Sequence, residues 1–163
     1  MIIRKANKED ILQVVELTKE WEKENITYGF VADTYEELLD YTCFVAVKEE
    51  KVIGFIFGKI YNSKNMGSIM PEGTPYFEVE EVYVKAGYRS LGLGSKLFLH
   101  LEEYLKSQAV YRIVLSTATK DYEKALHFYV NKLNMNVWSI RLFKNLDDKK
   151  EEWLDGYENN ERT

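Results

Sequence analysis

A strand that passes into a helix through a glycine-bearing turn is the feature that most restricts the fold of this chain. The strand is the β-prone run Phe77–Val84, and the helix is the amphipathic run from Leu93 to Ser107. The turn between them reads Arg89-Ser90-Leu91-Gly92-Leu93-Gly94. Glycine lets a ligand approach the backbone closely, and the first turn of a helix offers free N–H groups and the positive end of its dipole. With Arg89 adding a permanent charge, the turn predicts a phosphate site.

The strand before the turn has an irregular spacing. Its apolar residues Val79, Val82 and Val84 are separated by three positions and then by two, whereas a regular strand has a side-chain period of two. One extra residue at Glu80-Glu81 would place all three valines on one face, which is the pattern of a β-bulge beside a site. Taken without the turn, the spacing fits an edge strand with two solvated glutamates better.

Two other phosphate-binding turns do not fit these residues. The dinucleotide fingerprint needs a third glycine and a later acidic residue, but Gly94 is followed by Ser95, Lys96 and Leu97. A P-loop closes with Gly-Lys-Ser/Thr, which Gly94-Ser95-Lys96 does not supply. The glycine turn is therefore of a different kind.

The rest of the chain predicts a mixed α/β sheet, parallel around the glycine turn and antiparallel in a hairpin. A long polar loop, Asn62 to Pro75, follows that hairpin, and such loops are typical of function or mobility. The other expected elements are strands at Ile2–Ala6, Phe44–Val47, Val52–Ile60, Arg112–Thr117 and Asn136–Phe143, and helices after Asn7, from Thr34 and over Tyr122–Leu133.

Length and charge limit the class of protein. The 163 residues fit one domain over 1–146, followed by a charged tail at 147–163. A net charge of -5 argues against a nucleic-acid binder and suits cationic partners.

The single cysteine, Cys43, sits in an apolar run and is interpreted as a small core residue. No signal peptide or bilayer-spanning run is visible, so a soluble cytoplasmic protein without membrane partners is expected.

These motifs together resemble the GNAT superfamily of N-acetyltransferases. Arg89 to Gly94 matches the family's Arg/Gln-x-x-Gly-x-Gly/Ala pyrophosphate signature, and Val82-Tyr83-Val84 is similar to its bulged strand. The later run Ala125-Leu126-His127-Phe128-Tyr129 resembles the family helix that carries Phe-Tyr. The resemblance spans roughly Ile2 to Leu146.

The resemblance implies a central, partly antiparallel sheet of six to seven strands flanked by about four helices. It also implies acetyl-CoA as co-substrate and direct transfer of the acetyl group to a primary amine. The N–H of Val82 would polarise the acetyl carbonyl. The cofactor-binding residues would be Val82, Tyr83, Val84, Arg89, Ser90, Leu91, Gly92, Leu93, Gly94 and Ser95.

The chemistry needs a proton donor for the departing thiolate and a proton acceptor for the amine. Tyr129 matches the family tyrosine in the donor role. Glu80 matches the acceptor position of the polyamine-type members and Glu78 that of the histone-type members, with Glu81 a further candidate. Each glutamate could equally be a solvated strand residue, and the three are left open with Glu80 preferred.

Several features around this core remain open at the sequence level. The acceptor amine, small molecule or peptide, is expected near Tyr28 and Glu80, and acidic residues of the first two helices could line its site. Tyr122 replaces an asparagine that often contacts the cofactor in the family. No metal site is expected, and a homodimer is plausible. The alternative to an enzyme is a non-catalytic acyl-CoA-binding module of the same fold.

Overall fold

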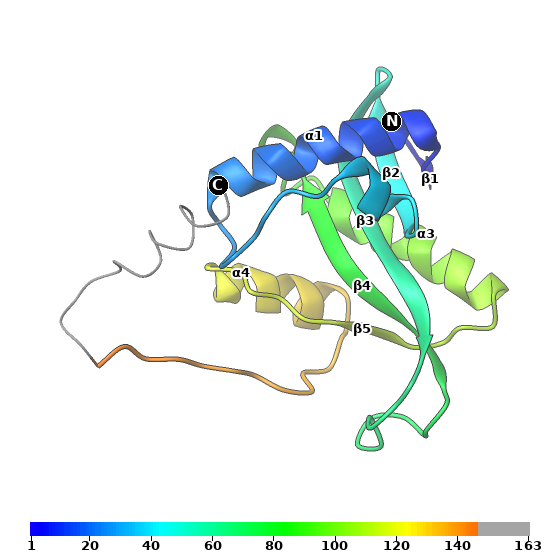
Figure 1. Ribbon diagram of the computed structural model, residues 1–163, viewed down its shortest axis with the longest axis vertical. Coiled ribbons are helices and arrows are strands. Elements are labelled where there is room, and N and C mark those ends of the chain that lie inside the picture. The colour runs from blue at the N-terminus through cyan, green and yellow to red at the C-terminus, as the bar shows by residue number, and fades with distance from the viewer. Residues whose placement is uncertain (147–163) are drawn as a thin grey trace.

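A computed structural model describes residues 1–146 as one mixed sheet with helices on both faces (Figure 1). The sheet has the order β1-β2-β3-β4-β5; β1 to β4 pair antiparallel, and β5 pairs parallel to β4. The strands are β1 (Ile2–Lys5), β2 (Thr42–Lys48), β3 (Lys51–Asn62), β4 (Pro75–Val84) and β5 (Ile113–Leu115). The α/β class and the antiparallel hairpin are confirmed.

The helices are α1 (Lys8–Glu24), α2 (Tyr35–Leu38), α3 (Leu93–Ser107) and α4 (Tyr122–Leu126), which continues directly into the π-helical turn η2 (His127–Lys132). A 3-10 turn, η1 (Ala86–Tyr88), precedes α3. Capping boxes fix the starts of α1 and α2, since Asn7 and Thr34 each exchange hydrogen bonds with an acidic residue three positions on. About four helices were expected, and four α-helices are described.

Two apolar cores lie on opposite faces of the sheet. Val14 and Leu17 of α1 pack with Phe55 and Tyr83 on one face. Leu97, Phe98 and Leu101 of α3 pack on the other face with Ile56, Phe77 and Val79. Val82 and Val84 also lie against the α3 core. The valines therefore share a face as their spacing predicted.

A β-bulge at Glu80 places Val79, Val82 and Val84 on the same face of the sheet. Phe57 of β3 pairs with Glu81 and the next residue, Gly58, pairs with Val79, so Glu80 has no partner on β3. A Cβ on Gly58 would stand 1.9 Å from the carbonyl oxygen of Glu78. Only glycine admits so close a backbone approach, so Gly58 is the residue of β3 that accommodates the bulge.

The sheet is smaller than expected. Within residues 1–146 the structure has five strands instead of six to seven, and β5 is three residues long instead of covering Arg112–Thr117. The strand expected at Asn136–Phe143 is absent from this part of the chain. A strand needs a hydrogen-bonded neighbour as well as β-prone residues, and this segment has none in the described chain. The tail at 147–163 lies outside the described residues.

The structure also describes the connection between β3 and β4, the surroundings of Cys43 and the length of the helices. The connection between β3 and β4 is packed, because Ser63 Oγ donates to the Pro71 carbonyl (2.6 Å) and its own Met66 and Met70 are buried. Cys43 is buried in the α1 core, and burial raises the pKa of its thiol to about 12, so it acts as a core residue. No helix among the described residues is long and apolar enough to cross a membrane.

Candidate active site

Strands β4 and β5 separate at the bulge. β4 and β5 pair from Phe77 with Ile113 to Val79 with Leu115, and the pairing stops there. β4 then continues to Val84 beside β3 alone. The edge of β4 that faced β5 is therefore open from Glu80 onward, within the described chain.

The bulge decides which backbone groups face this open edge. Phe77 N–H donates to Arg112 O (2.9 Å) on the β5 side, whereas Lys85 N–H donates to Ile53 O (3.0 Å) on the β3 side. Because successive residues of a strand alternate in direction, Val82 and Val84 direct their N–H groups away from β3. Without the extra residue at Glu80 they would point toward β3. Among the described residues, the structure thus leaves two strand donors free at the edge that β5 has left.

The glycine turn follows at the end of the same strand. Ser90 and Gly92 have φ angles of 63° and 74°, the left-handed conformation that a tight turn requires. The first bond within α3 runs from Lys96 N–H to Gly92 O (3.2 Å), and Gly92 has no side chain to cap the helix. The N–H groups of Leu93, Gly94 and Ser95 consequently have no acceptor within the helix, and this turn fits a pyrophosphate.

Gly94 has a further role in packing. A Cβ at this position would meet the ring of Phe128 at 2.9 Å. Phe128 lies on η2 beside Tyr129, with their ring centres 5.1 Å apart. The absence of a side chain at Gly94 therefore seats the helix that carries Tyr129 directly against the turn.

The side chain of Arg89 is folded inward, in contrast to the expected free charge at the turn. Its guanidinium makes two hydrogen bonds to Glu24 (2.7 and 2.8 Å), and its Nε donates to the Val84 carbonyl (2.7 Å). Tyr83 donates its hydroxyl to the same carboxylate (2.5 Å). Burial opposes ionisation of Glu24, but the hydrogen bonds from Arg89 and Tyr83 outweigh it and lower the pKa of this carboxyl. Arg89 ties the turn to the last turn of α1.

The three candidate glutamates meet around the bulge but differ in their surroundings. Glu80 is exposed, Glu78 is half-buried, and Glu81 points toward the α1 face with its Oε2 atom buried. Burial first, and then the negative charge of Glu80, raise the pKa of Glu78. Burial first, and then the charge of Asp33, raise the pKa of Glu81 to about 9.

Glu81 and Asp33 form a carboxyl pair. The buried Oε2 of Glu81 and Oδ2 of Asp33 have no donor among the described residues, and burial raises the pKa of Asp33 as well. A proton held by Glu81 and donated to Asp33 satisfies this pair. Asp33 is itself positioned by α1, because its N–H donates to Thr18 Oγ1 (3.1 Å). At neutral pH Glu81 is therefore a hydrogen-bond donor.

Tyr129 lies on the α3 side of the open edge. It packs edge-on against Phe98 (6.1 Å between ring centres) and belongs to the same apolar cluster as Val82, Val84 and Leu115. Burial raises the pKa of its hydroxyl to about 12, so the proton stays on the oxygen at physiological pH. Its helix widens into a π turn at this residue, a distortion that is common at functional sites.

Comparison with known proteins agrees with this geometry. The family model described as "Acetyltransferase (GNAT) family" matches residues 11–135. The chain belongs to the GNAT acetyltransferase family. Acetyl-CoA is the cofactor of this family, and the free donors at Val82, Val84 and the start of α3 fit it. A search of curated proteins found no match.

Solved GNAT-like structures share the fold at low identity. A tetramutant of the BH1408 protein from Bacillus halodurans has a TM-score of 0.69 and 21% identity, with 90% of this chain and 100% of that chain covered. The aminoglycoside N-acetyltransferase AAC(6')-Iy in complex with CoA has a TM-score of 0.65 and 17% identity, covering 90% and 99%. An aminoglycoside acetyltransferase from an uncultured soil metagenomic sample, in complex with sisomicin, has a TM-score of 0.66 and 17% identity, covering 90% and 96%.

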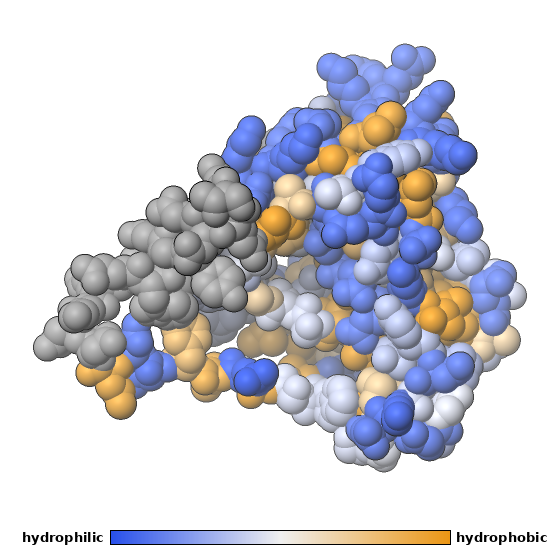
Figure 2. Space-filling model, viewed as in Figure 1, coloured by the Kyte–Doolittle hydropathy of each residue, from blue (hydrophilic) through white to orange (hydrophobic). Residues whose placement is uncertain are grey.

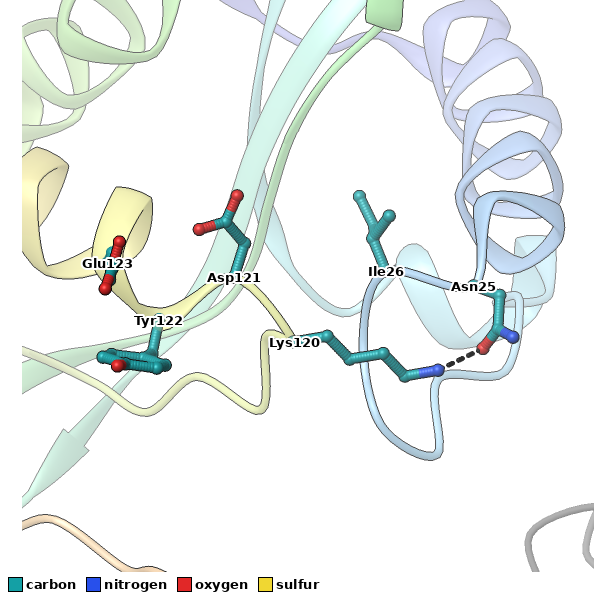
Figure 3. A pocket seen from close by; sticks show the side chains of 6 residues that line it. All are labelled: Asn25, Ile26, Lys120, Asp121, Tyr122 and Glu123. Atoms are coloured by element: carbon teal, nitrogen blue, oxygen red, sulfur yellow. Dashed lines mark hydrogen bonds between the residues drawn. The ribbon is translucent and has the colours of Figure 1, made fainter. Parts of the chain in front are cut away.

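A pocket of about 450 Å³ lies between the end of α1 and the start of α4 in this GNAT domain (Figure 3). It is lined by Asn25, Ile26, Lys120, Asp121, Tyr122 and Glu123. A short bridge between Thr27 and Thr119 joins its two sides, and Lys120 Nζ donates to Asn25 Oδ1 (2.7 Å; Figure 3). Tyr122, the departure from the family pattern, thus lines a pocket between the α1 and α4 loops.

Tyr28, the expected acceptor-binding residue, lies beside this pocket. Lys120 Nζ stands 5.3 Å from its ring centre, and Phe143 packs edge-on at 5.7 Å. Its ring therefore already contacts a cation and a second aromatic residue, and the structure does not bring it together with Glu80 through any described contact. The two expected acceptor contacts lie on different elements.

Sequence reasoning missed three residues that shape the site. Glu24 and Asp33 are among the acidic residues on and after the first helix that were expected to line the acceptor site. In the structure the Glu24 carboxylate binds Arg89, and Asp33 pairs with Glu81. Gly58 carried one usable signal, since a glycine inside a strand often marks a bulge or a close approach.

Proposed function

We propose that this GNAT domain transfers the acetyl group of acetyl-CoA to a primary amine by direct attack within a ternary complex. The observation that carries the proposal is the open edge of β4, where the bulge turns the N–H groups of Val82 and Val84 away from β3. An acyl donor that pairs with this edge would extend along the strand toward the start of α3. The reacting end would then lie beside the bulge.

The backbone would hold acetyl-CoA. Val82 and Val84 would pair with its extended arm, whereas the backbone of Tyr83 faces β3. The N–H groups from Ser90 to Ser95 would surround its pyrophosphate. Acetyl-CoA supplies a thioester whose carbonyl carbon is attacked by the amine. The N–H of Val82 is the donor available to stabilise negative charge on the carbonyl oxygen, the role that backbone donors have in acyl transfer.

Tyr129 would be the general acid. Its hydroxyl is protonated because burial raises its pKa to about 12, and it lies in the cluster that contains Val82 and Val84. A proton from this hydroxyl would neutralise the departing thiolate. The contact between Phe128 and Gly94 supports its position.

Glu80 would be the proton acceptor. It is exposed at the bulge, where its negative charge adds to the effect of burial in raising the pKa of Glu78 and, less, of Glu81. Glu81 is less suited to this role at neutral pH, because burial and the charge of Asp33 keep it protonated. We therefore assign Glu81 to hydrogen bonding with Asp33 and Glu80 to accepting the amine proton, directly or through water.

The acceptor would be a small cationic amine. Glu80 and the singly protonated Asp33–Glu81 pair place net negative charge beside the bulge, which attracts ammonium groups. The structural neighbours named as aminoglycoside acetyltransferases, one of them in complex with sisomicin, support an amine-rich small molecule. Protein lysines and N-termini remain within the same chemistry.

Thiol release from acetyl-CoA with a panel of amines tests this proposal. Polyamines, aminoglycosides, amino-acid amides and a lysine peptide are compared using wild type and Tyr129→Phe. We expect turnover with at least one amine and a loss of roughly 100-fold in kcat for Tyr129→Phe, the range of general acid catalysis. Tyr111→Phe, an exposed tyrosine before β5, is the matched control and should keep wild-type rates.

Two outcomes would contradict the proposal. Stabilisation of the protein by acetyl-CoA without turnover on any amine would indicate an acyl-CoA-binding module. Full activity of Tyr129→Phe with a productive amine would remove Tyr129 from the acid role while leaving acetyl transfer in place.

A further inference from the structure

The face of the sheet that carries α1 extends beyond the helix. Val14 and Leu17 of α1 pack on the half of β3 and β4 that holds Phe55 and Tyr83. Farther along, the two strands continue past α1 and α2 toward the loop that connects them (Figure 1). Figure 2 shows this part of the surface as a mixture of blue hydrophilic and pale residues, not as one continuous orange patch. This part of the face is therefore open and polar.

Two tyrosines, a lysine and a glutamate occupy the open part of the face. Side chains two positions apart on a strand share a face, so Lys59 and Tyr61 follow the buried Phe57 on the α1 side of β3. Their partners on β4 are Glu78 for Lys59 and Tyr76 for Tyr61. The ring centres of Tyr61 and Tyr76 lie 6.0 Å apart, and the rings are tilted by 34°. Two aromatic rings thus lie one step beyond a carboxylate.

Lys59 demonstrates that a tyrosine ring on this face binds an ammonium group. Its Nζ atom stands 4.2 Å from the ring centre of Tyr41, which itself packs on Phe57. Among the described residues, Lys59 forms no ion pair with a carboxylate. The ammonium is therefore held by the face of the ring. Tyr61 and Tyr76 offer rings of the same kind, and no cation of the described chain lies over either.

Negative charge gathers around these rings. Glu78 and Glu80 form no ion pair within the part of the chain that the structure describes. Burial first, and then the charge of Glu80, raise the pKa of Tyr41. Burial first, and then the charge of Glu78, raise the pKa of Tyr76. Carboxylates close to aromatic rings attract a cation, and Lys59 supplies one positive charge against two negative ones.

We propose that a tyrosine face, made of Tyr61, Tyr76 and Glu78, binds a second ammonium group of the acceptor. This inference rests on the proposed function, since Glu80 marks the position of the amine that is acetylated. Glu78 and Tyr76 stand two and four positions before Glu80 on β4, which corresponds to roughly 7–13 Å at about 3.3 Å per residue. The acceptor therefore carries a second ammonium group at this distance from the first.

Lys59 competes with such a ligand. It pairs with Glu78 across the two strands and has the same charge as the ligand. Lys59→Met keeps the length of the side chain and removes that charge. The variant should bind a diamine more tightly than wild type, which is the opposite sign to the effect of removing a tyrosine ring.

Calorimetric binding of α,ω-diamines to the full chain tests the tyrosine face without reference to turnover. Diaminooctane is compared with aminooctanol, in which a hydroxyl replaces the second ammonium group, and with diaminobutane, whose ammonium groups are closer together than the required span. We expect diaminooctane to bind wild type roughly tenfold more tightly than aminooctanol, as one cation–π contact beside a carboxylate would give. Diaminobutane should bind without dependence on the rings.

Tyrosine variants identify the groups responsible. Tyr61→Leu and Tyr76→Leu should remove the advantage of diaminooctane, whereas Tyr61→Phe keeps the ring and should retain it. Tyr61 is 40% exposed, so its replacement leaves the core intact. Tyr111→Leu is the matched control, because Tyr111 is an exposed tyrosine outside this face, and it should bind as wild type does.

Three results would overturn the inference: equal binding of diaminooctane and aminooctanol by wild type, an advantage that survives both leucine variants, or weaker diamine binding by Lys59→Met. Thiol release from acetyl-CoA with the same compounds separates this inference from the proposed function. Acetylation of aminooctanol with no preference for diaminooctane would refute the tyrosine face and leave acetyl transfer in place. Ring-dependent binding of diaminooctane without turnover on any amine would support the tyrosine face and refute the proposed function.

Discussion

Replacing Glu81 by glutamine should make the protein more stable at neutral pH. Glu81 holds its proton in the folded state because burial, the charge of Asp33 and the hydrogen bond to Asp33 raise its pKa to about 9. In the unfolded chain its pKa returns to the ordinary value of 4.5. Folding above pH 4.5 therefore requires the uptake of a proton. Glutamine is neutral in both states and can still donate a hydrogen bond to Asp33.

The size of the effect follows from the difference in pKa. Each pH unit above 4.5 stabilises the unfolded wild-type chain by about 1.4 kcal/mol until the folded carboxyl also ionises near its raised pKa. Between pH 4.5 and pH 7 the unfolded wild-type chain is stabilised by about 3 kcal/mol at most, and this is the largest gain in stability expected for Glu81→Gln at pH 7. Because the raised pKa belongs to an acid, the stability of wild type falls as pH rises through this window. The gain from Glu81→Gln should be near zero at pH 4.5 and grow toward alkaline pH.

Urea unfolding of wild type and Glu81→Gln across this pH window measures the difference directly. Glu103→Gln is the matched control, since Glu103 is an exposed glutamate on α3, and its unfolding free energy should follow that of wild type closely. The reasoning is refuted if the difference between wild type and Glu81→Gln does not vary with pH, or if wild type is the more stable protein at neutral pH.

Three further predictions concern the backbone and the ion pair beneath the turn. Gly58→Ala should destabilise the fold by about 3 kcal/mol in urea unfolding, because its Cβ meets the Glu78 carbonyl; Gly67→Ala, with open space around it, should not. Gly94→Ala should raise the activation free energy derived from kcat by more than it lowers the unfolding free energy, because the new methyl group displaces Phe128 beside Tyr129. A Gly94→Ala protein with the kcat of wild type would contradict this. Arg89→Gln should destabilise by about 1–2 kcal/mol, and Glu24→Gln in the same chain should recover part of this loss in a double-mutant cycle.

The features that could be predicted from the sequence are those that local spacing determines. The interval from Val79 to Val82 predicted the bulge, because side-chain alternation along a strand is a local property, and β4 has the extra residue at Glu80. The turn before α3 was predicted equally well, since Gly92 has a positive φ and begins the helix. The proposed site consists largely of backbone groups on these two neighbouring elements.

Features that depend on partners distant in sequence could not be predicted. Arg89 carries a permanent charge, but its direction is set by Glu24, which lies 65 positions earlier on α1. The protonation of Glu81 depends in the same way on Asp33, which arrives from the loop after α1. The segment Asn136–Phe143 has the composition of a strand, yet strand formation requires a neighbour, and the described chain supplies none.

The glycine turn and the proposed acid belong to one mechanical unit. The N–H groups of Leu93, Gly94 and Ser95 face the expected position of the pyrophosphate, while the missing side chain of Gly94 admits the Phe128 ring from the other direction. A cofactor that orders the turn would therefore also order η2, and with it Tyr129, through a contact that leaves no space for a methyl group. Binding and proton donation should accordingly respond together to a change at Gly94, whereas a change at Arg89 acts on the turn from the α1 side and should affect stability first.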